Sequence, residues 1–299
     1  MRSRSPGSSL AVPRRFWLYA IVLLLTIPNV IVFNFALNAL RSPEGIYDWE
    51  LFQEATARIG TGTLYHWGPM PSGTEYSYRY SPVLAYAMAP VVALGLEVWR
   101  LLHVAALLLL PKWLAAATLV AAPFWFDVAH ANVISFVFVF GYLTLRGSRW
   151  AALAYVVLAL LVPRPLMLPL LVWIVWKHPE WRMQIGAILL AYALLTLATG
   201  EAFSFMASLA HGTDIIAFNF NWGPSRFIGL WWLVIGVPLA AWLTWRGRIG
   251  FAAVAISPYW LGYYLLVLLW ELVPNQRPER GHGSPDVHPD RDLAVSAAE

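Results

Sequence analysis

The chain has 299 residues, of which 60% are hydrophobic and only 12% are Asp, Glu, Lys or Arg; its net charge is +4 and it contains no cysteine. Because a soluble domain carries about 25% charged residues, this composition excludes a cytosolic enzyme and a soluble nucleic-acid-binding protein, while the lack of cysteine excludes disulfides, thiolate catalysis and Cys-ligated metal. The apolar residues occur in repeated runs along almost the whole chain, which is typical of a polytopic membrane protein.

The N-terminal segment, residues 1–15, is basic and rich in Pro and Ser, and we interpret it as a short disordered cytoplasmic tail. The first apolar run, residues 16–40, contains Pro28, Asn29 and Asn34. It is longer than the apolar region of about 7–15 residues in a signal peptide. We therefore favour an uncleaved first transmembrane helix over a cleaved signal peptide.

A polar first outer loop, residues 41–79, separates this run from the later ones. The later apolar runs cover residues 80–96, 101–126, 133–145, 150–163, 166–176, 184–199, 227–245 and 250–273. Lys and Arg are in excess on one side of the membrane if the run 101–126 crosses once, kinked at Pro111, and this arrangement gives about nine spans. Two crossings within that run would invert the orientation of every later span. If short segments re-enter the membrane, the number of helices rises to about ten or eleven.

Two further polar segments complete the organisation. Residues 200–226 are predicted to form a second outer loop, and residues 274–299 a disordered C-terminal tail, so that residues 16–273 make up one transmembrane domain. Some apolar runs, notably residues 166–176 with Pro163, Pro165 and Pro169 in or before them, are too short to cross the membrane as straight helices. Because broken backbone at membrane depth is tolerated where it lines a cavity, these prolines indicate a cavity at the outer side.

The first outer loop carries the acidic residues that suggest chemistry. If residues 47–59 are helical, Glu50, Glu54 and Arg58 share one face as an ordinary salt-bridge ladder, while Asp48 lies on the opposite, apolar face. A carboxylate on such a face needs a polar cavity or a partner. The alternative is that Asp48 is the N-cap of this helix, and the spacing leaves both interpretations open.

From Asp48 onward, a series of acidic, aromatic, small, basic and proline residues follows in a characteristic order and spacing. They are Asp48, Phe52, Ala55, Gly60, Leu64, Tyr65, Tyr80, Pro82, Ala131, Asn132, Arg164, Pro165, Leu166, Lys177, Trp181, Arg182, Ser257, Pro258 and Tyr264. This order resembles the GT-C glycosyltransferases, and most closely glycosyltransferase family 87, the polyprenol-phosphate-mannose-dependent mannosyltransferases. The resemblance covers about residues 16–272, with Arg164 where the family usually has Lys and Ala131 where it usually has Gly.

The resemblance implies an all-α integral membrane protein, a polytopic GT-C-like helical bundle with interfacial helices in an outer-face loop. It also implies inverting transfer of a sugar, such as mannose, from a polyprenyl-phosphate donor to a lipid or glycan acceptor on the outer face of a cell membrane. Asp48 takes the position of the catalytic base, with Glu50 as the fallback if the segment does not begin as a helix. The departing phosphate needs cationic groups, for which Arg164, Arg79 and Arg226 are candidates.

Other polar and aromatic side chains are candidates for binding the sugar or the acceptor: Tyr80, Asp127, His130, Asn132, His211, Asn221 and Trp222. For the tyrosine, anchoring at the membrane interface is the alternative role, and for the second outer loop a merely solvated amphipathic segment. A divalent metal bound by Asp127 and His130 is the alternative, but it is not indicated because no further ligand is spaced to complete the site; no cofactor is expected. His103, within an apolar run, is interpreted as a core histidine with satisfied hydrogen bonds.

Two other classes of function remain. One is a lipid-linked-sugar flippase or small-solute transporter, although the chain lacks the inverted repeats typical of many transporters; the other is a non-enzymatic membrane scaffold. Convergence of Asp48 and Arg164 on one outward cavity would favour the transferase.

Overall fold

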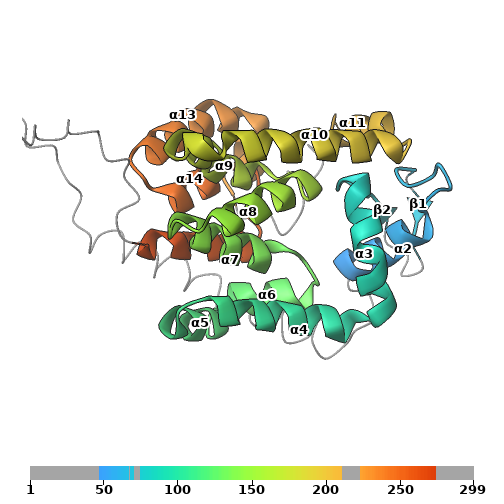
Figure 1. The fold of residues 1–299 in the computed structure, drawn as a ribbon, viewed down its shortest axis with the longest axis horizontal. Coiled ribbons are helices and arrows are strands. Elements are labelled where there is room, and N and C mark those ends of the chain that lie inside the picture. Colours follow the sequence, from blue (N-terminus) through green and yellow to red (C-terminus); the bar gives the residue numbers. More distant parts are fainter. Residues whose placement is uncertain (1–46, 67, 71–74, 211–222, 274–299) are drawn as a thin grey trace, which may run out of the picture.

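The computed structural model describes residues 47–66, 68–70, 75–210 and 223–273 (Figure 1). The α-helices are α2 (Tyr47–Ala57), α3 (Pro82–Leu94), α4 (Leu96–Ala106), α5 (Lys112–Leu119), α6 (Ala122–Ala129), α7 (Ile134–Leu145), α8 (Arg149–Leu161), α9 (Leu168–Lys177), α10 (Arg182–Ala198), α11 (Ala202–Ala210), α12 (Ser225–Ile228), α13 (Trp232–Trp245) and α14 (Ile249–Ile256). The 3₁₀ helices are η1 (Leu107–Leu109), η2 (Pro165–Met167), η3 (Pro179–Trp181), η5 (Gly229–Trp231) and η6 (Gly262–Leu272). The predicted all-α class is confirmed for these residues. The predicted first transmembrane helix and both predicted tails lie outside them.

A minimal two-stranded ladder interrupts the helices. Strand β1 (Gly68–Pro69) pairs antiparallel with β2 (Glu75–Tyr76), with Gly68 opposite Tyr76. The first outer loop therefore contains the short helix predicted there, α2, followed by this ladder.

Proline divides the chain into more helices than the apolar runs predicted. Pro111 stands immediately before α5, Pro123 lies in the first turn of α6, and Pro258 separates α14 from η6. Proline lacks an N–H and suits the start of a helix better than its interior. One apolar run in the sequence therefore becomes two or three short helices.

The run 101–126 does not cross as one kinked helix. His103 in α4 lies 3.6 Å from the carboxylate of Asp127 in α6, whereas two residues 24 positions apart on a continuous helix would be separated by about 36 Å. The chain therefore turns back through α5, and α6 lies beside α4 (Figure 1). The predicted single helix, kinked at Pro111, is therefore wrong for this run, because Pro111 ends one helix and starts another.

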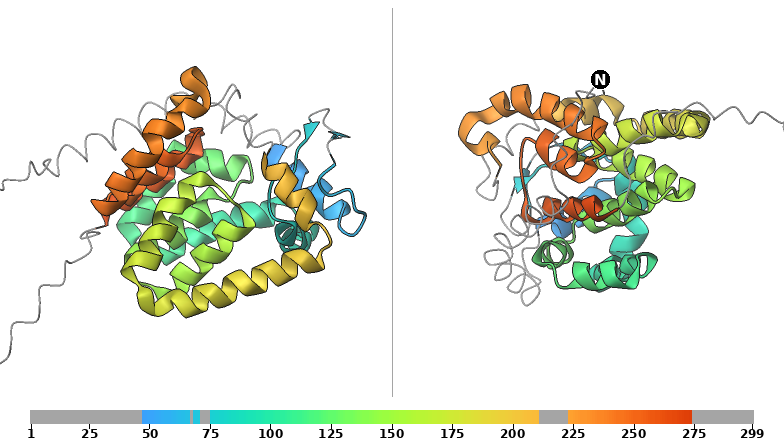
Figure 2. Two further views of the ribbon diagram at one scale, coloured as in Figure 1. Left: turned by 90° about the horizontal axis from the view of Figure 1, so that it is seen from above. Right: turned by 90° about the vertical axis from the view of Figure 1, so that its left-hand side faces the viewer.

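Two helical segments of the described chain, Pro179–Ala198 and Ser225–Trp245, are long and apolar enough to cross a membrane. A third results only if Pro82–Leu94 and Leu96–Leu109, bent by 107° against each other, form one broken span. Both long segments expose large apolar side chains, among them Leu190 and Val234, which is compatible with contact to lipid. Helix α10 runs along one side of the bundle towards α3 and α11 (Figure 2).

The main core forms where α7, α8, α14 and η6 pack together. Trp270 of η6 is fully buried and donates its indole N–H to the backbone oxygen of Phe138 in α7 at 2.9 Å. Gly141, one turn further along α7, leaves room for the indole ring. A Cβ atom at position 141 would lie 2.1 Å from Cζ2 of Trp270.

We expect Gly141→Ala to lower the free energy of unfolding by about 1–3 kcal/mol, because the added methyl group overpacks a filled core. Thermal unfolding in detergent measures the effect. Gly186→Ala on α10 is the matched control, because nothing lies within 4 Å of a Cβ atom there and alanine is the better helix former. Equal unfolding temperatures for both variants would contradict the packing described for Trp270.

Candidate active site

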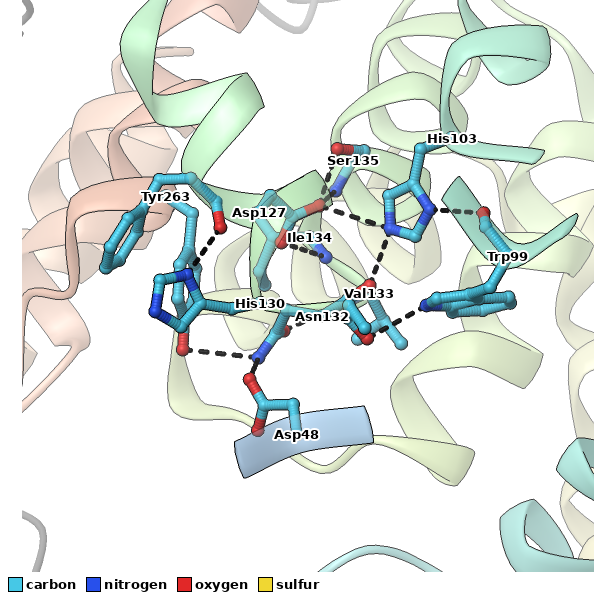
Figure 3. Close-up of polar contacts among 12 residues, drawn as sticks. Asp48, Trp99, His103, Asp127, His130, Asn132, Val133, Ile134, Ser135 and Tyr263 are labelled. Carbon is cyan, nitrogen blue, oxygen red and sulfur yellow. Dashed lines mark hydrogen bonds and ion pairs between the residues drawn. The ribbon is translucent and has the colours of Figure 1, made fainter. Parts of the chain in front are cut away.

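Segments far apart in the sequence meet around the side chain of Asn132, which is almost completely buried (Figure 3). Its Nδ2 donates to Oδ2 of Asp48 at 2.6 Å and to the hydroxyl of Tyr263 at 3.2 Å. Its Oδ1 accepts from Nη2 of Arg164 at 3.2 Å and from the backbone N–H of Val133 at 2.8 Å. We call the following residues the Asn132 cluster: Asp48, Tyr80, Asn132, Arg164, Tyr263 and Tyr264.

Helix α2 brings Asp48 to this cluster. Phe52 and Ala55 on the same face are buried, and the Phe52 ring lies 5.7 Å from that of Tyr80. On the opposite face, Arg58 pairs with Glu54 at 2.8 Å, as the predicted ladder requires. Asp48 thus lies on the buried face as expected, and its bond to Asn132 favours the interpretation that it has a polar partner over the interpretation that it is the N-cap.

Burial is the dominant influence on the carboxyl group of Asp48. It raises the pKa of Asp48 above the ordinary value of 3.8, against the opposing effects of Arg164, the Asn132 hydrogen bond and His130; Asp127 adds to the increase. A carboxyl group with a raised pKa accepts a proton more readily than one in water, and this suits a general base.

The turn between α6 and α7 fixes the position of Asn132. Ala131 adopts a left-handed conformation with φ 56°, which glycine adopts more easily. Its carbonyl oxygen accepts from the indole N–H of Trp99 at 2.9 Å, and the carbonyl oxygen of Asn132 lies 2.6 Å from Nε2 of His103. The turn is thus held by α4 through two side chains, although it contains alanine where the resembled family has glycine.

His103 is the core histidine that the sequence predicted. It is fully buried, and both ring nitrogens face backbone carbonyl oxygens, Nδ1 that of Trp99 at 2.8 Å and Nε2 that of Asn132. Both ring nitrogens therefore lie within hydrogen-bonding distance of a polar partner. The carboxylate of Asp127 lies 3.6 Å from Nε2.

Arg164 reaches the cluster from an extended backbone between two prolines. Its Nη1 donates to the hydroxyl of Tyr264, and its Nη2 donates to the hydroxyl of Tyr80 at 2.7 Å and to Asn132. The guanidinium also lies 5.5 Å and 5.3 Å from the ring centres of these two tyrosines. These bonds occupy three of its five N–H groups, and the side chain is only half-buried.

A series of tyrosines positions Tyr80. The hydroxyl of Tyr65 donates to the backbone oxygen of Tyr80 at 2.8 Å, and that of Tyr78 donates to the backbone oxygen of Ser81 at 3.0 Å. The Ser81 N–H in turn donates to the backbone oxygen of Leu161, close to Arg164. The Tyr-rich segment thus joins the first outer loop to the end of α8.

Asp127 is turned away from the cluster, towards the N-terminus of α7. It is fully buried and accepts from the backbone N–H groups of Ile134 at 3.2 Å and Ser135 at 2.7 Å, and from the Ser135 hydroxyl at 2.5 Å. A carboxylate at a helix N-terminus satisfies free N–H groups and complements the helix dipole. The geometry therefore favours a structural role over the predicted sugar-binding role.

We expect Asp127→Asn to lower the free energy of unfolding by about 1–3 kcal/mol, because its amide would point an N–H at a backbone or hydroxyl donor. The midpoint of thermal unfolding in detergent measures this loss. An unchanged midpoint together with lost ligand binding would instead return Asp127 to the set of ligand-binding residues.

The remaining predicted residues fall into different places. His130 is half-buried, with Nδ1 2.9 Å from the backbone oxygen of Phe126, and it lies near Asp48 in Figure 3. Glu50 and Arg79 are half-buried and Arg226 is exposed on α12, and the hydrogen bonds of Asn132 and Arg164 include none of the three. Three predicted residues lie outside the described part of the chain: His211, Asn221 and Trp222.

Sequence reasoning did not select Tyr263 as a site residue. The tyrosine is buried and its hydroxyl accepts from Nδ2 of Asn132, while its neighbour Tyr264 accepts from Arg164. Adjacent residues contact the two ends of the cluster because both lie in the first turn of η6. The sequence signal was the Tyr-Tyr pair that follows Ser257 and Pro258.

Neither a metal site in the described part of the chain nor a known relative identifies the function of this cluster. Within the described residues, no group of three or more His, Asp or Glu side chains has an arrangement that could hold a metal ion. Comparison of the chain with models of protein families, with curated proteins and with solved structures finds no match. The geometry of the Asn132 cluster, together with the sequence resemblance, therefore carries the functional argument.

Proposed function

We propose that the chain is an integral membrane glycosyltransferase that moves a sugar, such as mannose, from a polyprenyl-phosphate donor to a lipid or glycan acceptor. The observation that carries the proposal is the position of Asp48 and Arg164 on either side of one Asn132 amide. The half-buried carboxylate of Asp48 can act as a base, and the half-buried guanidinium of Arg164, bonded to the same amide, can bind an anion. Transfer to a hydroxyl with loss of a phosphate needs these two groups.

In this mechanism the acceptor hydroxyl gives its proton to the Asp48 carboxylate while its oxygen attacks the anomeric carbon of the donor. The bond from that carbon to the phosphate oxygen breaks, and polyprenyl phosphate leaves with the electron pair. Its negative charge is stabilised by Arg164, whose planar guanidinium suits phosphate oxygens. Attack from the face opposite the leaving group inverts the anomeric centre.

The tyrosines of the cluster support the arginine in this mechanism. Tyr80 and Tyr264 both accept from Arg164 and so fix the direction in which its remaining N–H groups point. A preorganised cation stabilises the developing charge without rearrangement during the reaction. The long apolar segments described above suit a polytopic protein that acts at the outer face of a cell membrane on a lipid-linked donor.

The proposal is tested with the full chain purified in detergent and reconstituted into vesicles with a panel of radiolabelled polyprenyl-phosphate sugars. Transfer of label to a lipid or glycan acceptor is the expected result. Movement of the intact labelled lipid between leaflets, without transfer, would instead identify a flippase and overturn the proposal.

The transfer rate should depend on pH through Asp48. Because the base must be ionised, the rate falls as the pH drops below its pKa, and burial places that pKa above the ordinary value of 3.8. We therefore expect the midpoint of the acidic limb of the pH–rate profile to lie above pH 3.8. Measurement of kcat from about pH 3 to about pH 9 covers the titration of a carboxyl group. An acidic limb at or below the ordinary value would contradict the role of Asp48 as a buried base.

A further inference from the structure

The position of Asn132 suggests a role other than sugar binding, the role expected from the sequence. All four of its side-chain hydrogen bonds are made within the protein, to Asp48, Tyr263, Arg164 and the N–H of Val133. The side chain is 1% exposed. With its polar atoms occupied and its surface covered, Asn132 has little left to offer a sugar.

The orientation of the amide is fixed by its neighbours. Oδ1 accepts from the Val133 N–H at 2.8 Å, so the oxygen end faces this N–H and Arg164, and the nitrogen end faces Asp48. A rotated amide would place an N–H group against two donors and an oxygen against a carboxylate. Asn132 therefore presents a donor to the anion and an acceptor to the cation at the same time.

Without this amide, a carboxylate and a guanidinium at such a site would attract each other directly. The attraction between unit charges is several-fold stronger near a protein than in water, and Arg–carboxylate pairs are the strongest common ion pairs. A direct pair would occupy the two groups that the proposed reaction needs. The Asp48 carboxylate would be a weaker base and Arg164 would have fewer N–H groups for phosphate.

We propose that Asn132 is a positioning residue that separates Asp48 from Arg164 and so keeps the base and the phosphate-binding group available before the donor binds. The role of this separation in catalysis rests on the proposed function. The separation of the two charged side chains can be measured in the protein without substrate. The charges of His130 and Asp127 also act on Asp48, and Tyr263 interacts with both Asp48 and Arg164. The hydrogen bonds that connect the carboxylate to the guanidinium directly through one side chain are those of the Asn132 amide.

The experiment compares Asn132→Ala with the unmodified full chain in neutral detergent, by two measurements. The first is the titration of the Asp48 carboxyl, obtained from infrared difference spectra against Asp48→Asn. Loss of the amide hydrogen bond alone would raise the pKa of Asp48, whereas a direct pair with Arg164 lowers it. We expect a lower pKa, and an unchanged or higher value would overturn the inference.

The second measurement is the binding of dodecyl phosphate, a single-chain phosphate probe. We expect Asn132→Ala to weaken binding about 10-fold, equivalent to about 1.4 kcal/mol, because the carboxylate competes for Arg164. Adding Asp48→Asn to this variant removes the competing charge and should restore the original affinity. A purely structural or ligand-contacting role for Asn132 predicts no such restoration, and that result would overturn the inference.

Two further variants keep the test decisive. Asn132→Ser retains an oxygen near the Val133 N–H but is too short to reach both charged groups, so it replaces Asn132→Ala if that variant does not fold. Thr144→Ala is the matched control, because Thr144 is buried on α7 and its hydroxyl donates to the backbone oxygen of Phe140. It should change neither the carboxyl titration nor probe binding.

The two measurements separate this inference from the proposed function. If the unmodified protein binds no dodecyl phosphate, the assignment of Arg164 to a donor phosphate fails, while the carboxyl titration still decides whether Asn132 separates the charges. If the probe binds but Asn132→Ala changes neither measurement, the inference fails and the transferase proposal remains.

Discussion

Asp48→Asn should reduce sugar transfer by about 10²-fold or more while donor binding is retained, because the substitution removes only the proton acceptor. The asparagine side chain has nearly the same size, and α2 keeps its buried face of Phe52 and Ala55. Steady-state kinetics on reconstituted protein, with a separate donor-binding assay, measure the two effects. A fall in kcat with little change in KM is the expected pattern.

Glu50→Gln is the matched control for this variant. Glu50 lies two residues from Asp48 on α2 and is half-buried like it, but a helix places the two side chains on different faces. Near-normal transfer by Asp48→Asn together with an inactive Glu50→Gln would move the base to Glu50. Normal transfer by both variants would remove the mechanism.

Arg164→Gln should weaken donor binding by about 100-fold, because a charge-assisted contact to phosphate contributes about 1.5–3 kcal/mol. Glutamine can keep one hydrogen bond to the neighbouring tyrosines, so the cluster should remain folded. Binding of a polyprenyl-phosphate sugar in detergent, titrated at constant salt, measures the loss.

Arg146→Gln is the control for Arg164→Gln. Arg146 is exposed at the C-terminus of α7, whereas the Asn132 turn precedes the N-terminus of the same helix. An isolated exposed arginine contributes little to stability, and we expect donor binding to be unchanged. Equal losses in the two variants would show that Arg164 acts through the fold and not through the phosphate.

The proposed transferase mechanism uses few of the polar side chains that the sequence made candidates. Asp127, one of these candidates, instead accepts from the N-terminus of α7 next to the turn that carries Asn132, and the core residue His103 contacts the same turn. The mechanism proposed above uses one amide and the two charged groups that bond to it. Polar residues that lie close together in this apolar chain therefore have two different roles, because some contact the turn or the adjoining helix and others form the proposed site.

The sequence by itself determined the helical class and the buried face of α2, and it singled out Asp48 and Arg164, which both bond to Asn132 in the structure. Each follows from local physics: the length of apolar runs, the 100° step of a helix, and the cost of placing an arginine between prolines in an apolar segment. The prediction that His103 is a satisfied core residue is confirmed for the same reason, because a lone histidine in an apolar run must find partners.

Only the tertiary structure decided which residues meet. The reversal of the chain between α4 and α6 depends on how short helices pack after Pro111, and it places His103 against Asp127 where the sequence predicted one helix kinked at Pro111. Asn132 bonds to Asp48 from 84 positions away and to Tyr263 from 131 positions away. No spacing rule reaches across such separations, because packing of side chains from many elements determines them, whereas hydropathy and helix periodicity act only within a few turns.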